Sequence, residues 1–345
     1  MRVLFVTPGF AKDEQDTSCI PPLQLLAREL VRQGVEVTVL ALDYPFGKGT
    51  RRWHGIEVIC CGGRNRRGFG KLLTLLGAWS KMRSLGKRFD LVHSFWLQDT
   101  ALLAERFSKK LSIPHVLTLM GQDALPSNNY LKRFHFGRAR IIALSEFHAR
   151  SFRESSGRSP AQLIPWGIDL RSFGNSSDHR DIDVLGVGSL IPLKQYEQWI
   201  EAVAELAKNG APVRAVLVGE GSERGNLEAL AKKLNAEKLF TFAGALSREE
   251  TIALMKRSKI LLHASRYESF GYVFAEALAA GMKIVSYPVG CAAASPRWQL
   301  AQKKEDLPEA VHRFLEESFR AEPEVPFTMG DTAAAYISVY RELKR

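Results

Sequence analysis

The sequence lacks any apolar run that is long enough to cross a membrane. No uncharged stretch approaches the ~18 consecutive apolar residues that a membrane-spanning helix needs. Residues 1–10 are a short apolar run that ends at a turn, without the hydrophobic segment and small-residue cleavage site of a signal peptide. We therefore expect a first strand there and a protein that resides in the cytoplasm.

Cysteine is scarce, and its spacing excludes the common cysteine-based sites. The four cysteines are Cys19, Cys60, Cys61 and Cys291, and no two of them have CxxC or zinc-type spacing. The adjacent pair would point to opposite faces of a strand. We expect free or buried thiols in a reducing compartment, and no metal site.

Acidic residues are underrepresented in the first half of the chain. Residues 1–180 hold 27 Lys and Arg against 15 Asp and Glu, a net charge of +12, whereas residues 181–345 hold 21 against 22. This asymmetry indicates an anionic partner for the first half: a phosphate-bearing substrate, an anionic membrane surface or nucleic acid. At 345 residues the chain is also long for one core, which predicts two domains.

Short β-branched runs alternate with amphipathic stretches along the whole chain. The expected strands are 2–7, 36–41, 56–60, 91–93, 114–119, 140–144, 162–164, 182–187, 213–218, 240–242, 260–263 and 283–286. The expected helices are 22–32, 71–85, 100–111, 195–208, 226–234, 249–258 and 271–279. Strands separated by helix-length segments predict βαβ units and parallel sheets.

The domain boundary is predicted at residues 174–178, a small polar cluster with the composition of a linker. We expect two doubly wound, Rossmann-like α/β domains that face a cleft, with residues 1–173 in the first and 181–325 in the second. Residues 326–345 would form a C-terminal helix that packs back towards the N-terminal domain. Ligands are expected where the carboxyl ends of the strands meet the cleft.

Glycines follow three of the predicted strands in the second half. Gly188 and Ser189 precede Lys194, which would open the next helix and place a cation near a helix N-terminus, and Gly219 and Gly244 end two further strands. Glycine at such turns lets backbone amides approach a phosphate, and the last strand end could receive a flat base. A strand, a turn and a solvated lysine with no ligand would give the same pattern.

Two glutamates seven residues apart give the most specific pattern. Glu268 lies on a predicted loop, and Phe270 and Gly271 lead into a helix whose first amides form an anion site. Glu276 lies in the otherwise apolar part of that helix, where an ionised carboxylate is costly unless it is paired. Ribose hydroxyls would pair with Glu276, and Glu268 is placed to touch a sugar. Alternatively, Glu268 faces solvent and Glu276 belongs to a structural network.

Taken together, the glutamate pair and its Phe-Gly and Glu-Ala-x-Ala-x-Gly surroundings strongly resemble the signature of family 4 glycosyltransferases. The preceding Gly-x-Leu-x-x-x-Lys, Val-Gly-x-Gly and Phe-x-Gly elements occur in that family's order, and residues 163–169 look like its inter-domain segment. The resemblance covers nearly the whole chain. It implies the GT-B fold and a retaining sugar transfer from a nucleotide-sugar donor that needs no metal and no cofactor.

By that likeness, Lys194 and the amides of Phe270 and Gly271 would hold the donor diphosphate. Glu276 would bind the ribose and Glu268 the transferred sugar. This is chemically coherent, because a lysine and helix amides can neutralise the charge of the leaving diphosphate. Residues 181–183 have DxD spacing but begin a strand, so we interpret them as solvated charge and not as a metal site.

Several residues depart from the family's pattern. Ser189 stands where an arginine is usual, Gln195 stands for a glycine, and Cys291 stands for the second glycine of a pair. Residues 19–22 (Cys-Ile-Pro-Pro) replace a Gly-Gly pair, and prolines cannot donate amides to a phosphate. Met120 takes the place of a histidine at the catalytic site. Hydrogen bonding there would therefore depend on Gln122 or Asp123.

A basic, amphipathic segment, Arg64–Arg88, dominates the charge of the first half. Five apolar side chains are expected on one face of its helix: Leu72, Leu75, Leu76, Trp79 and Met82. Such a helix could lie on anionic lipid at the inner face of a membrane, or it could face the core with a solvated basic side. The aromatic residues are not interleaved with the basic ones, so nucleic acid is not expected as a partner.

We therefore expect a hexosyl-type glycosyltransferase acting on a glycan, a lipid-linked or a phosphorylated acceptor, in the synthesis of a surface polysaccharide or glycolipid. The alternative is a degenerate GT-B protein that binds a nucleotide sugar or glycan without turnover.

Overall fold

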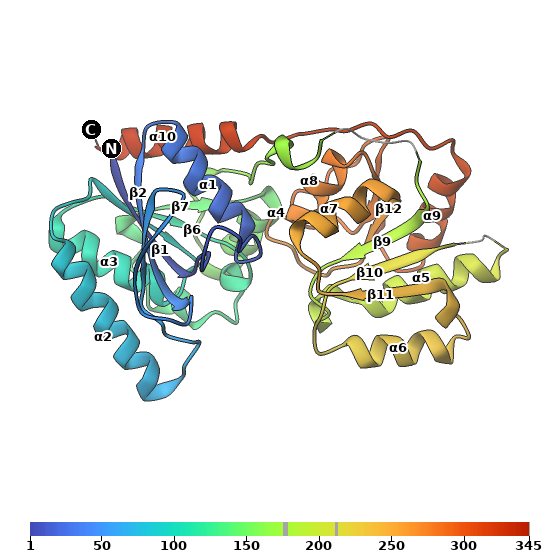
Figure 1. Ribbon diagram of the computed structural model, residues 1–345, viewed down its shortest axis with the longest axis horizontal. Coiled ribbons are helices and arrows are strands. Elements are labelled where there is room, and N and C mark those ends of the chain that lie inside the picture. Colours follow the sequence, from blue (N-terminus) through green and yellow to red (C-terminus); the bar gives the residue numbers. More distant parts are fainter. Residues whose placement is uncertain (175–178, 211–212, 345) are drawn as a thin grey trace. The chain divides into compact units, whose positions relative to one another are not determined.

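The computed structural model describes residues 1–174, 179–210 and 213–344, and the chain divides into two compact units (Figure 1). Unit 1 comprises Met1–Gly167 and Met329–Arg345, and unit 2 comprises Ile168–Thr328. Residues 168–173, assigned above to the first domain, thus belong to unit 2. The expected linker residues 175–178 lie outside the described part of the chain.

Unit 1 is an eight-stranded sheet with helices on both faces. Its strands are β1 (Arg2–Gly9), β2 (Glu36–Tyr44), β3 (Gly49–Trp53), β4 (Ile56–Cys60), β5 (Leu91–Phe95), β6 (His115–Thr118), β7 (Ala139–Ala143) and β8 (Gln162–Leu163). Its α-helices are α1 (Pro21–Arg32), α2 (Gly68–Leu85), α3 (Asp99–Leu111), α4 (Glu146–Ser156) and α10 (Met329–Lys344). The strand order is β3-β4-β2-β1-β5-β6-β7-β8.

One edge of this sheet corrects the expectation of purely parallel pairing. β3 pairs antiparallel with β4, whereas the other strand pairs of unit 1 are parallel. The turn between β3 and β4 is His54-Gly55, and both residues have positive φ (44° and 80°), as a two-residue hairpin requires. The sequence of β3, Gly-Thr-Arg-Arg-Trp, has little apolar alternation and therefore does not predict a strand.

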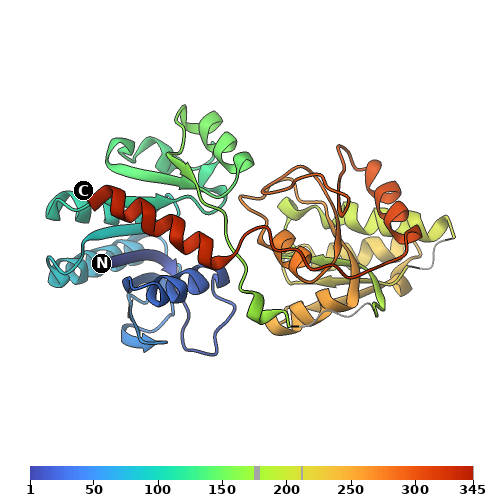
Figure 2. The same ribbon diagram turned by 90° about the horizontal axis from the view of Figure 1, so that it is seen from above.

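The alternation of side chains along β1 explains how both faces are covered. Leu4 and Val6 pack in a cluster with residues of α2 and α3. Phe5 points the other way and makes an edge-to-face contact with His93, whose ring lies 5.1 Å from that of Tyr336 on α10. Successive residues of a strand face opposite sides, so α2 and α3 cover one face and α10 the other (Figure 2).

A buried polar network fastens α10 to the sheet of unit 1. His93 Nδ1 lies 2.6 Å from the Tyr340 hydroxyl, and His93 Nε2 lies 2.8 Å from the Thr118 hydroxyl. The Thr118 hydroxyl also lies 3.0 Å from that of Tyr336. Thr332 donates to the carbonyl of Pro165. The last helix of the chain is therefore an integral layer of unit 1.

Unit 2 is a parallel sheet in the order β11-β10-β9-β12-β13-β14. Its strands are β9 (Ile182–Val187), β10 (Ala215–Val218), β11 (Phe240–Gly244), β12 (Ser258–His263), β13 (Lys283–Ser286) and β14 (Trp298–Leu300). Its α-helices are α5 (Tyr196–Lys208), α6 (Arg224–Lys233), α7 (Arg248–Arg257), α8 (Tyr272–Ala279) and α9 (Asp306–Glu316). These two units bear out the prediction of α/β architecture with parallel sheets.

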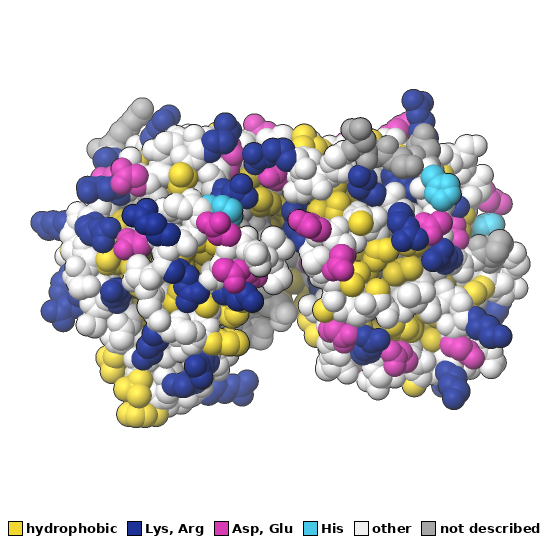
Figure 3. All heavy atoms as spheres, viewed as in Figure 1, with side chains coloured by type: hydrophobic (Ala, Val, Ile, Leu, Met, Phe, Trp, Pro, Cys, Tyr) yellow, Lys and Arg dark blue, Asp and Glu magenta, His cyan; other side chains and the backbone are white. Residues whose placement is uncertain are grey.

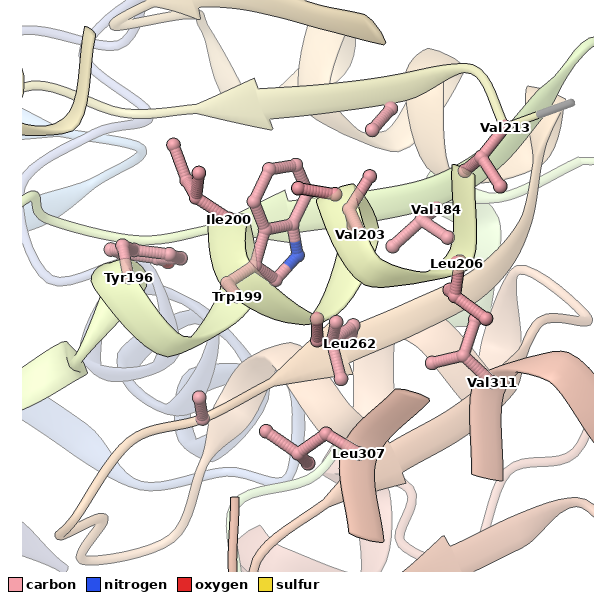
Figure 4. Close-up of a cluster of buried hydrophobic side chains, with 14 of the residues drawn as sticks. Val184, Tyr196, Trp199, Ile200, Val203, Leu206, Val213, Leu262, Leu307 and Val311 are labelled. Carbon is pink, nitrogen blue, oxygen red and sulfur yellow. The ribbon is translucent and has the colours of Figure 1, made fainter. Parts of the chain in front are cut away.

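A hydrophobic core of unit 2 is built around α5. Trp199 is fully buried among apolar residues of the sheet and the neighbouring helices, including Val203, Leu262 and Val311 (Figure 4). The stretch Tyr196–Lys208 presents Tyr196, Trp199, Ile200 and Val203 at helical spacing, which is why it forms an amphipathic helix. This packing fixes the position of the loop that precedes α5.

The apolar stripe expected on α2 is not a single face. Met82 is buried, whereas Leu72 and Leu76 are exposed, and Leu75 and Trp79 are half-buried. Only the C-terminal part of α2 therefore contributes fully to the core. No helix within the described residues is both long and apolar enough to cross a membrane.

Candidate functional site

Glycines lie at the carboxyl ends of β9, β10 and β11, so this edge of the unit 2 sheet carries few side chains. Gly188 follows β9 and donates to the carbonyl of Val218 (3.0 Å), and Gly219 donates to the carbonyl of Gly244 (2.8 Å). A Cβ on Gly219 would lie 1.9 Å from the carbonyl oxygen of Gly188, so this position requires glycine. Ser189 is exposed beside these turns. Main chain is therefore accessible at this edge.

Lys194 ends a 3₁₀ turn (Pro192–Lys194) and does not open α5, which begins at Tyr196. Gln195 between them has φ 49°, a left-handed conformation that glycine adopts more readily. The Lys194 amine forms an ion pair with the carboxylate of Glu268. The fold thus brings together two residues that are 74 positions apart and that the sequence analysis selected separately.

His263 is the third member of this cluster. It ends β12, is 1% exposed, and its Nε2 lies 2.7 Å from Glu268 Oε1. Its Nδ1 makes no hydrogen bond within the described part of the chain. Because a carboxylate only accepts, Nε2 carries the proton. Burial would raise the pKa of Glu268, but the hydrogen bond from His263 and the charge of Lys194 lower it to about 2.

The segment after Glu268 leads into the N-terminus of α8. Gly271 has φ 75°, and a Cβ there would lie 2.4 Å from the ring of Phe274, which explains the glycine. The ring of Phe270 is buried against Phe327, so only its main chain is available to a ligand. Among the residues that the structure describes, no side chain caps α8, and its first turn has no acidic residue. This arrangement suits an anion.

Glu276 lies on α8 and forms an ion pair with Arg248 of α7 (Nε to Oε1, 3.1 Å). Arg248 also donates to the hydroxyl of Ser172 (3.1 Å). Burial raises the pKa of Glu276, and the charge of Arg248 opposes that rise. The carboxylate is therefore held by an arginine that the sequence analysis did not single out.

Asp123 belongs to unit 1, whereas the residues above belong to unit 2. Its carboxylate is buried and accepts from three backbone amides, those of Leu97 (2.8 Å), Met120 (3.1 Å) and Gly121 (2.6 Å). These bonds order the loop that follows β6. The carboxylate of Asp123 is thus hydrogen-bonded to backbone amides.

The DxD sequence at the start of β9 is engaged in ion pairs, which revises its interpretation as solvated charge. Asp181 pairs with Arg257 and Arg214, and Asp183 pairs with Lys259. The hydrogen bond from Arg257 outweighs burial and lowers the pKa of Asp181 to about 2. Among the described residues, no group of three or more His, Cys, Asp or Glu side chains has an arrangement that could hold a metal ion.

Sequence reasoning missed His263 and Arg248. The sequence does contain a signal for His263. It is a polar residue at the end of a buried strand, five positions before Glu268, and is therefore expected at the same edge of the sheet as Glu268. Arg248 follows the capping serine of α7 and resembles any exposed helical arginine in sequence. Only the packing of α7 beside α8 brings it to Glu276.

Comparison with known proteins agrees with this geometry. Residues 23–172 match the family described as Glycosyltransferase Family 4, and residues 169–295 match Glycosyl transferases group 1, so the two matches together span most of the chain. The chain belongs to the family 4 glycosyltransferases. The similarity stated from the sequence motifs is thereby confirmed.

Curated relatives resemble only part of this glycosyltransferase. An uncharacterized glycosyltransferase of Methanocaldococcus jannaschii is 29% identical over 207 residues, which cover 58% of this chain and 56% of the relative. The 2-deoxystreptamine glucosyltransferase of Streptomyces kanamyceticus is 34% identical over 104 residues, which cover 30% of this chain and 27% of the relative. The matched region thus spans about half or less of these proteins.

Solved structures resemble the whole glycosyltransferase in fold. Sucrose-phosphate synthase from Thermosynechococcus elongatus has a TM-score of 0.78 at 19% identity, covering 99% of this chain and 98% of the other. Anabaena HepE in complex with UDP and glucose has a TM-score of 0.70 at 20% identity, covering 99% and 96%. The two α/β units are those of the GT-B fold.

Proposed function

We propose that this glycosyltransferase transfers a hexosyl group, with retention of configuration and without a metal, from a nucleoside diphosphate sugar to an acceptor hydroxyl. The observation that carries the proposal is the cluster of Lys194, Glu268 and His263 at the carboxyl ends of the strands of unit 2. In the chain, His263 and Glu268 come shortly before the N-terminus of α8, which no described side chain caps, and Lys194 reaches Glu268 from the 3₁₀ turn before α5. A cation and helix amides together suit a diphosphate.

Each part of the donor has a proposed partner. The diphosphate would contact Lys194, the turns at Gly188 and Ser189, and the amides of Phe270 and Gly271. Glu276, kept close to Arg248, would accept hydrogen bonds from the ribose hydroxyls. The base would lie along the main chain at Gly219 and Gly244. Solved relatives in complex with UDP and UDP-glucose support a uridine donor.

The ion pair of Lys194 and Glu268 suggests how the site responds to the donor. When the diphosphate arrives, it competes with Glu268 for the amine of Lys194. Glu268 keeps its hydrogen bond to His263 at 2.7 Å and can then accept from a hydroxyl of the transferred sugar. In the reaction, the bond from the anomeric carbon to the diphosphate breaks, the acceptor oxygen bonds to that carbon, and the acceptor proton passes to the leaving diphosphate.

For the acceptor we propose a glycan, a lipid-linked or a phosphorylated molecule in the cytoplasmic synthesis of a surface polysaccharide or glycolipid. The excess of positive charge in residues 1–180 supports a phosphate-bearing acceptor. Relatives whose names specify D-inositol 3-phosphate glycosyltransferase and Vi polysaccharide biosynthesis are 30% identical over 168 and 131 residues. Asp123 is proposed to shape the acceptor loop after β6.

The test is nucleotide binding and sugar transfer with Lys194→Ala. Calorimetry with UDP, GDP and ADP in the presence of EDTA should show binding of one nucleotide, and a panel of nucleotide sugars should show turnover. Lys194→Ala should lower kcat by about 10²-fold or more, because a cation that stabilises the leaving group contributes that much. The matched control is Lys259→Ala, since Lys259 lies at the opposite end of β12. Equal activity of Lys194→Ala and wild type would reject the proposal.

A second candidate function is binding of a nucleotide sugar without turnover. The observation that favours it is the engagement of Asp123 by three amides next to Met120, a side chain that cannot act as acid or base. Tight UDP binding combined with neither transfer nor donor hydrolysis across the panel would support this second function.

A further inference from the structure

The start of α2 exposes a cluster of large apolar side chains. Four of the seven large hydrophobic residues that are exposed in the described chain fall within eight positions there: Phe69 (73% exposed), Leu72 (50%), Leu73 (53%) and Leu76 (56%). We call these four residues the apolar patch. Figure 3 shows hydrophobic side chains gathered at the lower end of α2, with Lys and Arg side chains close by.

The apolar patch is a second face of α2, opposite to the core. Its members have the spacing i, i+3, i+4 and i+7, which places them on one side of a helix. The core-facing residue Ala78 follows Phe69 by nine positions, or two and a half turns, and therefore points the other way. At least half of each patch side chain is exposed, so packing within unit 1 does not account for the patch.

Positive charge surrounds the patch, and acidic residues balance only part of it. Residues 58–89 contain eight Lys and Arg and no Asp or Glu. Lys71 is neutralised by an ion pair with Asp99, but Arg66 and Arg67 make no ion pair within the described residues. A cavity of about 210 Å³ shares Leu73 with the patch and is also lined by the exposed side chains of Lys48 and Lys81.

We propose that the apolar patch inserts into an anionic membrane while Arg66 and Arg67, together with Lys48 and Lys81, contact the lipid phosphates. Apolar side chains at the tip of a basic segment suit an anionic bilayer, because stable attachment of a soluble protein takes both an apolar and an electrostatic contribution. A protein partner would need an acidic ring around an apolar pocket. This inference goes beyond the proposed sugar transfer and holds whether or not that transfer is correct.

The experiment is flotation of the full chain with vesicles of phosphatidylglycerol mixed with phosphatidylcholine, and with vesicles of phosphatidylcholine alone. We expect binding to the anionic vesicles at low salt, little binding to the neutral ones, and release at high salt. Leu72→Ser/Leu76→Ser and Arg66→Glu/Arg67→Glu should each weaken partitioning by about tenfold or more. Both pairs are exposed, and new carboxylates at the start of α2 favour the helix dipole, so the fold should be retained.

Matched controls separate the patch from general effects. Leu170→Ser removes an equally exposed leucine of unit 2, and Lys232→Glu/Lys233→Glu changes the net charge by the same amount on α6. Neither control should alter vesicle binding.

The proposal is overturned if wild type does not bind anionic vesicles at low salt, or if the controls lose as much binding as the patch variants. It is also overturned if Leu72→Ser/Leu76→Ser abolishes self-association in sedimentation velocity while vesicle binding is unchanged, because the patch would then be an interface between copies. UDP binding is measured alongside, and its absence would bear on the proposed transfer and not on the membrane.

Discussion

Arg248 and Glu276 form a largely enclosed ion pair, with side chains that are 15% and 13% exposed and a distance of 3.1 Å between Nε and Oε1. Burial raises the pKa of Glu276 in spite of the nearby guanidinium. A carboxyl whose folded-state pKa lies above its unfolded value destabilises the fold when it is ionised at neutral pH. A buried carboxylate that destabilises the fold in this way is a candidate for a role in ligand binding rather than in stability.

Glu276→Gln should therefore leave the Tm equal or higher while it weakens nucleotide binding. The amide keeps an acceptor for Arg248 but no longer offers a charged acceptor to ribose hydroxyls, so we expect at least about a tenfold rise in the Kd for UDP. Calorimetric titration and a thermal melt measure the two effects. Glu249→Gln, an exposed neighbour of Arg248 on α7, is the control and should change neither.

The ribose assignment has its own test with 2′-deoxy-UDP and 3′-deoxy-UDP. If Glu276 binds a ribose hydroxyl, wild type should lose affinity for at least one of these analogues, whereas Glu276→Gln should bind it nearly as well as UDP. An equal loss in both proteins would show that another group contacts the ribose.

Glu268→Gln should destabilise unit 2 in a pH-dependent way. The folded-state pKa of Glu268 is about 2, against 4.5 for an ordinary glutamate, because His263 and Lys194 outweigh burial. A depressed pKa stabilises the fold fully above pH 4.5, and this contribution disappears as the pH falls towards 2. We expect wild type to exceed Glu268→Gln by up to about 3 kcal/mol in the free energy of unfolding at pH 7. Urea titrations at pH 7, 5 and 4 should show a constant gap down to about pH 5 that then narrows; a gap that widens on acidification would contradict the assignment.

His115 should make unit 1 sensitive to mild acid. Burial lowers its pKa from 6.5 to about 3, and its Nε2 lies 2.8 Å from the Ser94 hydroxyl. Between these two pH values the unfolded chain holds a proton that the folded chain does not, so stability is lost as the pH falls below 6.5. His115→Leu should flatten this dependence by about 1.4 kcal/mol per pH unit. Urea midpoints at pH 7.5, 6 and 5 measure it, and His312→Leu, at an exposed histidine, should keep the wild-type slope.

Tyr340→Phe should weaken the attachment of α10. The tyrosine hydroxyl lies 2.6 Å from His93 Nδ1 in a fully buried position, and its removal leaves the ring nitrogen without that partner. We expect a loss of about 1–3 kcal/mol in the free energy of unfolding. Tyr287→Phe, which removes a half-buried hydroxyl bonded to Gln198 in unit 2, should cost less. Equal stability of Tyr340→Phe and wild type would show that apolar packing alone holds α10.

Much of the architecture follows from the period of the apolar residues. Buried parallel strands such as β9 and β12 are rich in β-branched residues and leucine, and the sequence predicts them to within a few residues. The polar edge strand β3 lacks that pattern. The spacing of Leu72, Leu76 and Met82 predicts one apolar face on α2, because all three positions fall within one broad arc of the helix circumference. Only the packing shows that the apolar residues form two faces.

The candidate site divides in the same way. Lys194, Glu268 and Glu276 are recognisable in sequence because each belongs to a motif at a strand end or helix start. Their partners come from elsewhere: Arg248 reaches Glu276 from another helix, and the pairing of Lys194 with Glu268 depends on which strands are neighbours in the sheet. Such contacts depend on the tertiary fold, which local periodicity does not specify.

The position of α10 has a consequence for the order in which the protein matures. Unit 2 is continuous in the chain and has its complete sequence by Thr328, but unit 1 lacks one of its layers until residues 329–344 have been synthesised. His93, Thr118 and the face of the sheet around them therefore stay uncovered while the whole of unit 2 is translated. Unit 1 thus begins synthesis before unit 2 but can finish folding only after unit 2 has been translated, and a nascent chain stalled before Met329 would present that open face to chaperones.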